Sequence, residues 1–307
     1  MLRRVVMLAR DGKPLAVFCG LLALSLLIYQ EAVLELLRLA LTDIRYSHLL
    51  TVPVISLFLL SLERRKLAAE KESWFLPGLW LMLPAVAMFL LSKQIPSGTE
   101  WLTRVSASAS GLILFWISSF LFSFGRQAFH TAKFALFFLF LLVPMPPSLI
   151  DTFAGWLQKG SANTAFLLFR LFGIPVYREG LTLALPGVEI KVAAECSGIR
   201  SCFALFIVGV LGGHFLLQSF WARLCFIFIT IPVAVLKNAA RIVTISSLGV
   251  YVDRGFLYGR LHRNGGLPFS LLAFVMLIPA VVILRNWRPG VLGFRSMKRN
   301  GSDPDGC

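Results

Sequence analysis

The sequence predicts an all-α polytopic membrane protein with about eight transmembrane helices. A small extracytoplasmic insert, one helix and a β-hairpin, is expected before the sixth span. Two observations support this fold class. Of 307 residues, 57% are hydrophobic and 15% are charged, whereas soluble domains are about 45–50% apolar and about 25% charged. In addition, the apolar residues form runs of the length that a bilayer requires, and Lys and Arg gather in the short connections between them.

The apolar runs give eight candidate spans, with boundaries uncertain by a few residues. They lie near 15–37, 49–62, 74–92, 107–123, 134–150, 199–217, 224–249 and 267–285. The basic N-terminus before the first run resembles the start of a signal peptide. Because that run is long and has no small-x-small cleavage site at its end, we interpret it as a retained first helix.

The orientation follows from the basic residues in the connections. Eight spans put five clusters on one side, which by the positive-inside rule is the cytoplasm. These clusters are Arg3, Arg4, Arg10 and Lys13; Arg64, Arg65, Lys66 and Lys71; Arg126 and Lys133; Arg223; and Arg285, Arg288, Arg295, Lys298 and Arg299. We therefore expect one multi-pass membrane domain (1–290), a polar cytoplasmic tail (291–307) and both termini in the cytoplasm.

The long outer segment, about 146–197, has a structure of its own. Residues 149–172 form a helix of mixed polarity that we expect at the membrane surface. Residues 174–192 are interrupted by Gly180 and Pro186-Gly187, and 188–192 alternate apolar and charged side chains. This pattern is typical of a half-buried strand, so a small β-hairpin is predicted here.

Charge and cysteine content exclude several classes of function. The net charge of +15 suits either nucleic acid or an anionic membrane surface. No nucleic-acid-binding motif accompanies the charge, so the expected partner is the lipid bilayer. The five cysteines are odd in number and include no CxxC pair, which argues against a disulfide framework or a zinc site. There is no Gly-rich phosphate loop and no His/Glu metal spacing. No cofactor is expected.

Three reactive residues map to the outer membrane face in this topology. Cys196 precedes the sixth span, where the helix dipole favours a thiolate. Arg241 lies in the outer part of the seventh span, four residues after Lys237 and therefore on the same helix face. His262 lies in the loop before the eighth span. A thiolate nucleophile, an acid/base and a fixed cation together suit acyl transfer.

Each residue also has a purely structural interpretation. A single cysteine usually packs, a loop histidine is usually solvated, and an intramembrane Arg or Lys can pair with an acid such as Glu31, Glu35 or Glu195 or mark a transport path. The residues alone therefore leave an enzyme and a non-enzymatic membrane protein both open.

At these positions the sequence resembles the exosortase/archaeosortase family, over about 40–285. The resemblance rests on Ala194-Glu195-Cys196-Ser197-Gly198-Ile199-Arg200-Ser201, on Asn238-Ala239-Ala240-Arg241-Ile242, on His262 with Gly265, on Asp43-Ile44-Arg45-Tyr46-Ser47-His48 followed by Pro53, and on Pro144-Met145-Pro146. It implies a cysteine transpeptidase that acts on membrane-anchored proteins with a C-terminal sorting signal: a motif such as Pro-Glu-Pro, a membrane helix and an Arg-rich end. Gram-negative relatives accompany exopolysaccharide production.

The resemblance carries the catalytic Cys, Arg and His to Cys196, Arg241 and His262. Arg200, Asn238 and Lys237 are candidates for support of that site, and His48 competes with His262 for the role of the base. For Asp43, Tyr46 and His48, substrate contact and support of the loop both stay open. The acceptor is unknown. One alternative is a hydrolytic intramembrane cysteine protease, and another is a non-enzymatic transporter or scaffold for polysaccharide export.

Overall fold

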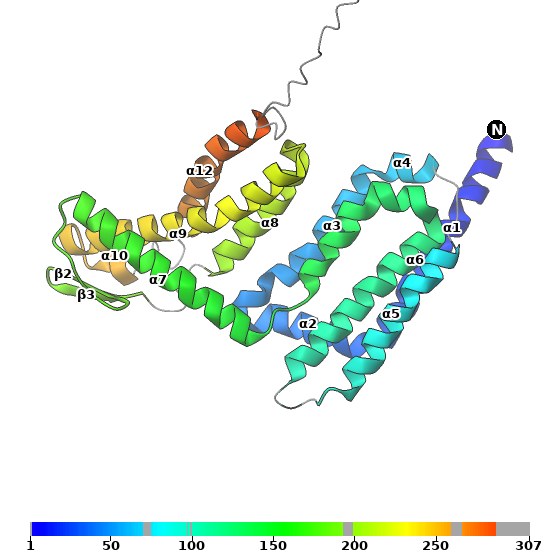
Figure 1. Ribbon diagram of the computed structural model, residues 1–307, viewed down its shortest axis with the longest axis horizontal. Helices are drawn as coiled ribbons and strands as arrows, with labels where there is room; N and C mark the ends of the chain where they lie inside the picture. The colour runs from blue at the N-terminus through cyan, green and yellow to red at the C-terminus, as the bar shows by residue number, and fades with distance from the viewer. Residues whose placement is uncertain are drawn as a thin grey trace, which may run out of the picture. The chain divides into compact units, whose positions relative to one another are not determined.

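The computed structural model describes residues 2–69, 75–96, 98, 100–192, 199–258 and 266–286. The chain divides into two compact units, Met1–Ala154 and Gly155–Cys307. Both are mostly helical, and the second also holds a small sheet (Figure 1). The predicted single membrane domain (1–290) stays a prediction, and the tail 291–307 lies outside the described residues.

The first unit contains only helices. They are α1 (Leu2–Ile28), α2 (Gln30–Thr42), η1 (Ile44–Leu50), α3 (Thr51–Leu62), α4 (Arg64–Ala69), α5 (Phe75–Gln94), α6 (Trp101–Phe138), η2 (Leu139–Leu142) and the first turns of α7 (Pro147–Leu171). Helices α1 and α2 meet at a bend of 78°. Tyr29 lies at this bend and donates a hydrogen bond from its hydroxyl to the carbonyl oxygen of Ala85 (3.1 Å), which ties the bend to α5.

Helix α6 reverses direction at Gly125 (Figure 1). Its φ of 86° and ψ of −177° are open to glycine because glycine has no Cβ. Before the turn, α6 runs beside α5, with a hydrogen bond from Ser118 Oγ to the Gly78 carbonyl (2.6 Å). After the turn it runs beside α3, where Ser56 Oγ donates to the Ala135 carbonyl (2.8 Å). The element α6 therefore consists of two antiparallel helical arms that meet at Gly125.

The structure confirms several apolar helices of membrane-spanning length but not the count of eight. Among the described residues, five helices are long and apolar enough to cross a bilayer, or six if the bent pair α1–α2 is one span. Two differences from the sequence-based count explain this. The predicted fourth and fifth spans merge into the stretch Trp101–Leu142, and the apolar stretch of the sixth, Ser201–Leu216, is short.

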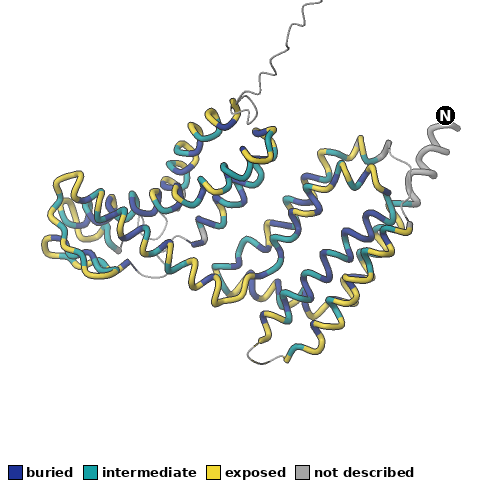
Figure 2. The backbone as a smooth tube through the Cα atoms, in the orientation of Figure 1, coloured by how far each residue is buried: buried dark blue, intermediate teal, exposed yellow. Residues whose placement is uncertain are grey.

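The surface of these helices is that of a membrane protein. Exposed residues follow the outer faces of the helices in both units (Figure 2). Many of them are large and apolar, among them Phe58, Leu90, Phe228 and Ile283. A soluble protein rarely exposes so much contiguous apolar surface, whereas lipid covers it without cost.

The second unit combines helices with a three-stranded antiparallel sheet. Its elements are the rest of α7, β1 (Tyr177–Glu179), β2 (Thr182–Leu185), β3 (Val188–Lys191), α8 (Ile199–Leu216), α9 (Phe220–Tyr251), α10 (Gly255–Tyr258) and α12 (Gly266–Asn286). The predicted helix 149–172 is confirmed as α7, which is not among the candidate spans, whereas its place on the outer side stays a prediction. The predicted hairpin has one more strand, because Gly180 (φ 59°) and Gly187 (φ 75°) both allow tight turns.

The core of this unit lies between one face of the sheet and the helices α7 and α9. Leu183, Leu185 and Val192 from the sheet pack with Phe169 of α7 and Val243 of α9. The small residues Ala162, Ala165 and Ala239 complete the cluster and let the helices approach closely. This packing fixes the middle of α9 beside strand β3, which is where the candidate site lies.

Candidate active site

The middle of α9 carries three polar side chains in an otherwise apolar helix. Lys237 and Arg241 are one turn apart and share a face, as predicted, and Asn238 lies between them in sequence. Lys237 is only 4% exposed and Asn238 only 2%, whereas Arg241 is half-buried. Burying such groups is costly unless they are satisfied by the protein. Each therefore needs a specific partner or a polar cavity.

Asn238 links α9 to α7. Its Nδ2 donates a hydrogen bond to Ser161 Oγ, 3.0 Å away, and both side chains are buried. One turn earlier on α7, Gln158 Nε2 donates to the carbonyl oxygen of Val192, just after β3. These two bonds tie α7 to α9 and to the end of the sheet. Asn238 thus makes an interhelical hydrogen bond, and its support of the catalytic site stays a prediction.

Arg241 lines a cavity of about 230 Å³ between β3 and α9. One wall is the whole of β3 together with Val192. The other wall includes Asn238, Ile242 and Ile245 of α9. A guanidinium keeps its charge at any physiological pH, and apolar neighbours strengthen its field on a group bound beside it. The cavity therefore suits a ligand group that carries or develops negative charge.

Lys237 has different neighbours from Arg241. It interacts electrostatically with Arg241 and with the thiol of Cys202, which lies near the start of α8. Cys202 is a buried free cysteine. The sequence suggested only apolar packing for Cys202, and nothing in its local pattern marks the approach of a lysine from another helix.

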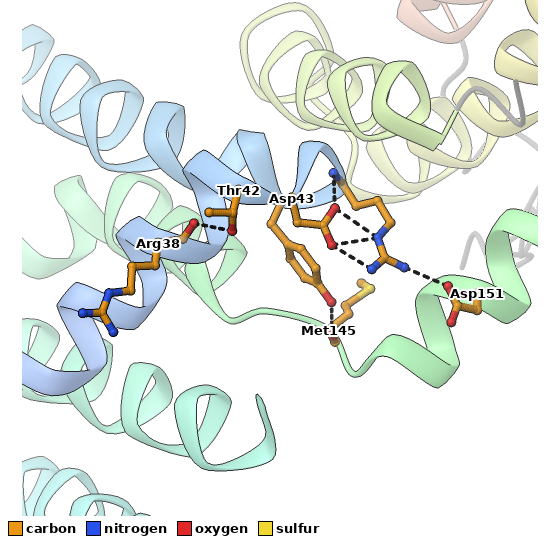
Figure 3. A network of polar contacts seen from close by, with 7 residues as sticks. Arg38, Thr42, Asp43, Met145 and Asp151 are labelled. Atoms are coloured by element: carbon orange, nitrogen blue, oxygen red, sulfur yellow. Dashed lines mark hydrogen bonds and ion pairs between the residues drawn. The ribbon is translucent and has the colours of Figure 1, made fainter. Parts of the chain in front are cut away.

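The Asp43–His48 region forms a polar turn within the first unit (Figure 3). Asp43 caps η1 by accepting from the backbone N–H of Arg45 (2.9 Å). The same carboxylate binds the Arg45 guanidinium through Nε and Nη2, the latter at 2.7 Å. Arg45 Nη1 also donates to Asp151 Oδ1 of α7 at 2.9 Å. The turn is therefore held by charge-assisted bonds on both sides of the arginine.

Tyr46 anchors the same turn to the Pro144-Met145-Pro146 segment. Its hydroxyl donates to the Met145 carbonyl oxygen at 2.9 Å, and its side chain is 1% exposed (Figure 3). Asp43 and Tyr46 thus make contacts that support the loop. Whether they also contact a substrate stays a prediction.

Electrostatics at Asp43 follow from this geometry. The hydrogen bond from the Arg45 side chain lowers the pKa of the Asp43 carboxyl, and partial burial opposes that shift less strongly. The aspartate is therefore ionised wherever the turn is folded near neutral pH. Its charge holds the arginine in place.

The structure places some of the predicted site residues and not others. Lys237, Asn238 and Arg241 come together on α9. His48 lies in η1 of the first unit. Cys196 and His262 lie outside the described residues, and Arg200 is the second residue of α8, with a side chain that is not described. The convergence of Cys196, Arg241 and His262 stays a prediction, as does the choice between His48 and His262.

Comparison with known families decides the membership of the chain. The family described as transmembrane exosortase (Exosortase_EpsH) matches residues 40–279, well over half of the sequence. The chain belongs to the transmembrane exosortase family. The matched range includes the η1 turn, α7, the sheet, α8 and α9 of this exosortase. Searches of curated proteins and of solved structures each found no match.

Within the described ranges, no group of three or more His, Cys, Asp or Glu side chains is arranged to hold a metal ion. The expectation that this exosortase needs no cofactor stays an expectation.

The sequence did not predict two contacts between distant residues of the chain. The Ser161–Asn238 and Arg45–Asp151 contacts join residues 77 and 106 positions apart. A partial signal existed, because Gln158 and Ser161 are polar residues one turn apart on a helix face that also carries Ala162 and Ala165. Only the fold shows which elements these polar groups meet.

Proposed function

We propose that this exosortase is a transpeptidase. It cleaves a C-terminal sorting signal from exported, membrane-anchored proteins through a Cys196 thioester and transfers the new C-terminus to an acceptor. The family match carries the proposal, because the matched range includes Cys196, Arg241 and His262. The cavity beside Arg241 supports it, since acyl transfer needs a fixed positive charge where an oxyanion develops.

The proposed chemistry assigns one role to each of the three residues. His262 takes the proton of the Cys196 thiol, and the thiolate attacks the scissile carbonyl. Arg241 stabilises the oxyanion of the tetrahedral intermediate. The intermediate collapses as the C–N bond breaks, and His262 protonates the leaving amine. The acceptor then attacks the thioester, gives its proton to His262 and frees the cysteine.

The other candidate residues support Cys196, Arg241 or His262 in this proposal, apart from His48. Asn238 holds α9 on α7, and so sets the position of Arg241 one turn away. Lys237 adds positive charge to the same helix face. In this proposal Arg200, four positions after Cys196 in the sequence, adds positive charge near the nucleophile. His48 is the competing base.

The proposed topology has eight passes in a cytoplasmic (inner) membrane. The number eight follows when the bent pair α1–α2 counts as one span, the two arms of α6 count separately and α8 is included. Both termini then lie in the cytoplasm, and Cys196, Arg241 and His262 lie near the outer face.

The product mass of a tagged protein tests the proposal. The tagged protein comes from the same genome and has a Pro-Glu-Pro-like motif, a membrane helix and a basic end at its C-terminus. We expect wild type to remove this signal and Cys196→Ala to leave it intact. Cys202→Ala is the matched control, since it removes a thiol six residues away, and should process normally. Equal processing by wild type and Cys196→Ala would contradict the proposal.

The same measurement separates the alternatives. An added group on the new C-terminus indicates transfer to an acceptor, whereas a free carboxylate indicates a hydrolytic protease. A transporter or scaffold would need Lys237 and Arg241 but not Cys196. Processing that depends on Cys196 therefore excludes that second class.

A further inference from the structure

The sheet of the second unit has an edge at β3 whose hydrogen-bonding groups point away from the sheet. The strand order is β1-β2-β3, so β3 is an edge strand, and no other described strand pairs with it. Val192 N–H donates to the Leu181 carbonyl at 3.0 Å, which makes this pair a hydrogen-bonded one. Hydrogen-bonded and non-hydrogen-bonded pairs alternate along an antiparallel ladder.

This alternation fixes which groups face outward. The register pairs Thr182 with Lys191 and Ala184 with Glu189. Both pairs are an odd number of steps from the Leu181–Val192 pair, so they are non-hydrogen-bonded pairs. The backbone N–H and C=O groups of Glu189 and Lys191 therefore point away from β2. They form a row of two donors and two acceptors along the outer edge of β3.

The same edge borders the cavity that Arg241 lines. Strand β3 forms one wall and α9 the other. The inward-facing side chains of β2 and β3 pack toward α9, as the buried cluster of Leu183, Leu185 and Val192 with Val243 shows. A strand added at this edge would lie about 4.8 Å from β3. Every second side chain of that strand would point into the cavity beside Arg241.

The side chains of β3 suit this arrangement. Val188 and Ile190 are half-buried toward the core, whereas Glu189 and Lys191 are exposed on the opposite face. Isolated edge strands are usually blocked by proline, a bulge or a covering element. Strand β3 has neither proline nor bulge, and no other described strand pairs with its outer edge, so this edge is able to pair with another extended chain.

We propose that the extended segment of the substrate next to the scissile bond binds as a fourth strand on β3. This inference rests on the proposed function for the identity of the occupant, and deepens it by naming the binding mode. Backbone hydrogen bonds to Glu189 and Lys191 give affinity, and the cavity at Arg241 selects the alternate side chains. Cys196 is five residues beyond Lys191 in the chain, within about 18 Å of fully extended backbone.

Proline substitutions in β3 test the edge directly. Glu189→Pro and Lys191→Pro remove outward N–H groups that the ladder does not use, and proline is tolerated on edge strands. Each is compared with alanine at the same position, which keeps the N–H. The probe is a synthetic peptide that covers the extracytoplasmic segment of the sorting signal used above. Binding is measured on the full-length Cys196→Ala protein in lipid nanodiscs, so that no chemistry interferes.

We expect each proline to weaken binding about threefold to tenfold relative to its alanine partner, and the pair together about tenfold to hundredfold. The matched control lies on the other edge of the sheet. The N–H of Arg178 on β1 also points outward, because it pairs with Leu183 in a non-hydrogen-bonded position. Arg178→Pro should bind as Arg178→Ala does. Thermal unfolding of every variant checks that the sheet is intact.

A second measurement leaves the protein unchanged. Backbone N-methylation of the peptide, one residue at a time, should weaken binding at every second position, since only alternate N–H groups of a paired strand face β3. Equal binding by the proline and alanine variants, a scan without alternation, or no binding of the peptide would each overturn the inference. Alternating binding without processing by wild type would instead overturn the proposed function and leave the edge as a peptide-binding site.

Discussion

The two polar clusters of this exosortase differ in what their charges contact. In the first unit, Arg45 forms ion pairs with both Asp43 and Asp151, and Tyr46 donates to a backbone carbonyl. In the second unit, Arg241 lines a cavity next to a sheet edge, with Lys237 as a second cation on its helix face. The first arrangement stabilises a turn, whereas the second places two cations of one helix face beside a cavity.

The largest difference in kcat should appear between a substitution of Arg241 and a substitution of Arg45. Arg241→Ala should lower the kcat of processing about 10²- to 10³-fold, because it removes the charge that stabilises the oxyanion. Arg241→Lys should recover part of the rate, since it restores charge without the planar guanidinium.

Arg45→Ala should lower the stability of the protein and leave kcat unchanged. It leaves the partly buried Asp43 without its main partner, at a cost of about 1–3 kcal/mol in unfolding free energy. The kcat per folded molecule should be retained. Two results would contradict the difference between the clusters. One is a loss of kcat with unchanged stability in Arg45→Ala, and the other is a loss of stability with unchanged kcat in Arg241→Ala.

The Ser161–Asn238 bond should couple stability and activity. Asn238→Ala leaves the Ser161 hydroxyl buried without this partner and should cost about 1–3 kcal/mol. A double-mutant cycle with Ser161→Ala measures the coupling energy by thermal unfolding. A coupling near zero would mean that this bond does not hold α9 on α7. The kcat should fall together with stability here, because Arg241 lies one turn away.

The Tyr46 hydroxyl should contribute stability alone. Tyr46→Phe removes the hydrogen bond to Met145 and should lower the unfolding free energy by about 1 kcal/mol. Processing kinetics should match those of wild type. A drop in kcat/KM without a change in stability would instead mean that Tyr46 contacts the substrate.

The smallest effect concerns pH. The folded-state pKa of Asp43 is lowered, so its contribution to stability is complete above the unfolded pKa of about 3.9 and is lost as the pH falls through the folded pKa. Thermal unfolding of wild type from pH 7 downward should show this loss, and Asp43→Asn should lack it. Equal pH profiles for the two proteins would contradict the assignment.

The sequence predicted elements better than contacts. Helix α7, strand β3 and the seventh span were predicted from local sequence patterns: mixed polarity for α7, alternation for β3 and a long apolar run for the span. The merging of two spans was not predicted, because a single glycine at φ 86° replaced the expected loop. The third strand was missed because β1 has three residues, too few for a periodic signal.

The chemistry assigned to the site stays a prediction, and the contacts around its residues were not predicted. The intramembrane Lys237 and Arg241 stood out because charges within a span are rare. The cavity, the Ser161 partner and the β3 edge could not be predicted, since each depends on which elements pack together. Periodicity gives the faces of an element but not the neighbour that each face meets.

Isolation of the acyl-enzyme tests the central claim most directly. Wild-type protein purified away from its acceptor should form the thioester faster than water hydrolyses it, so that the acyl-enzyme accumulates. The protein is incubated with the tagged substrate, quenched in acid, digested and examined by mass spectrometry, with and without hydroxylamine. The account predicts a substrate adduct on the peptide that contains Cys196, released by hydroxylamine. An adduct on Cys202 or any other residue, or processing by Cys196→Ala, would contradict it.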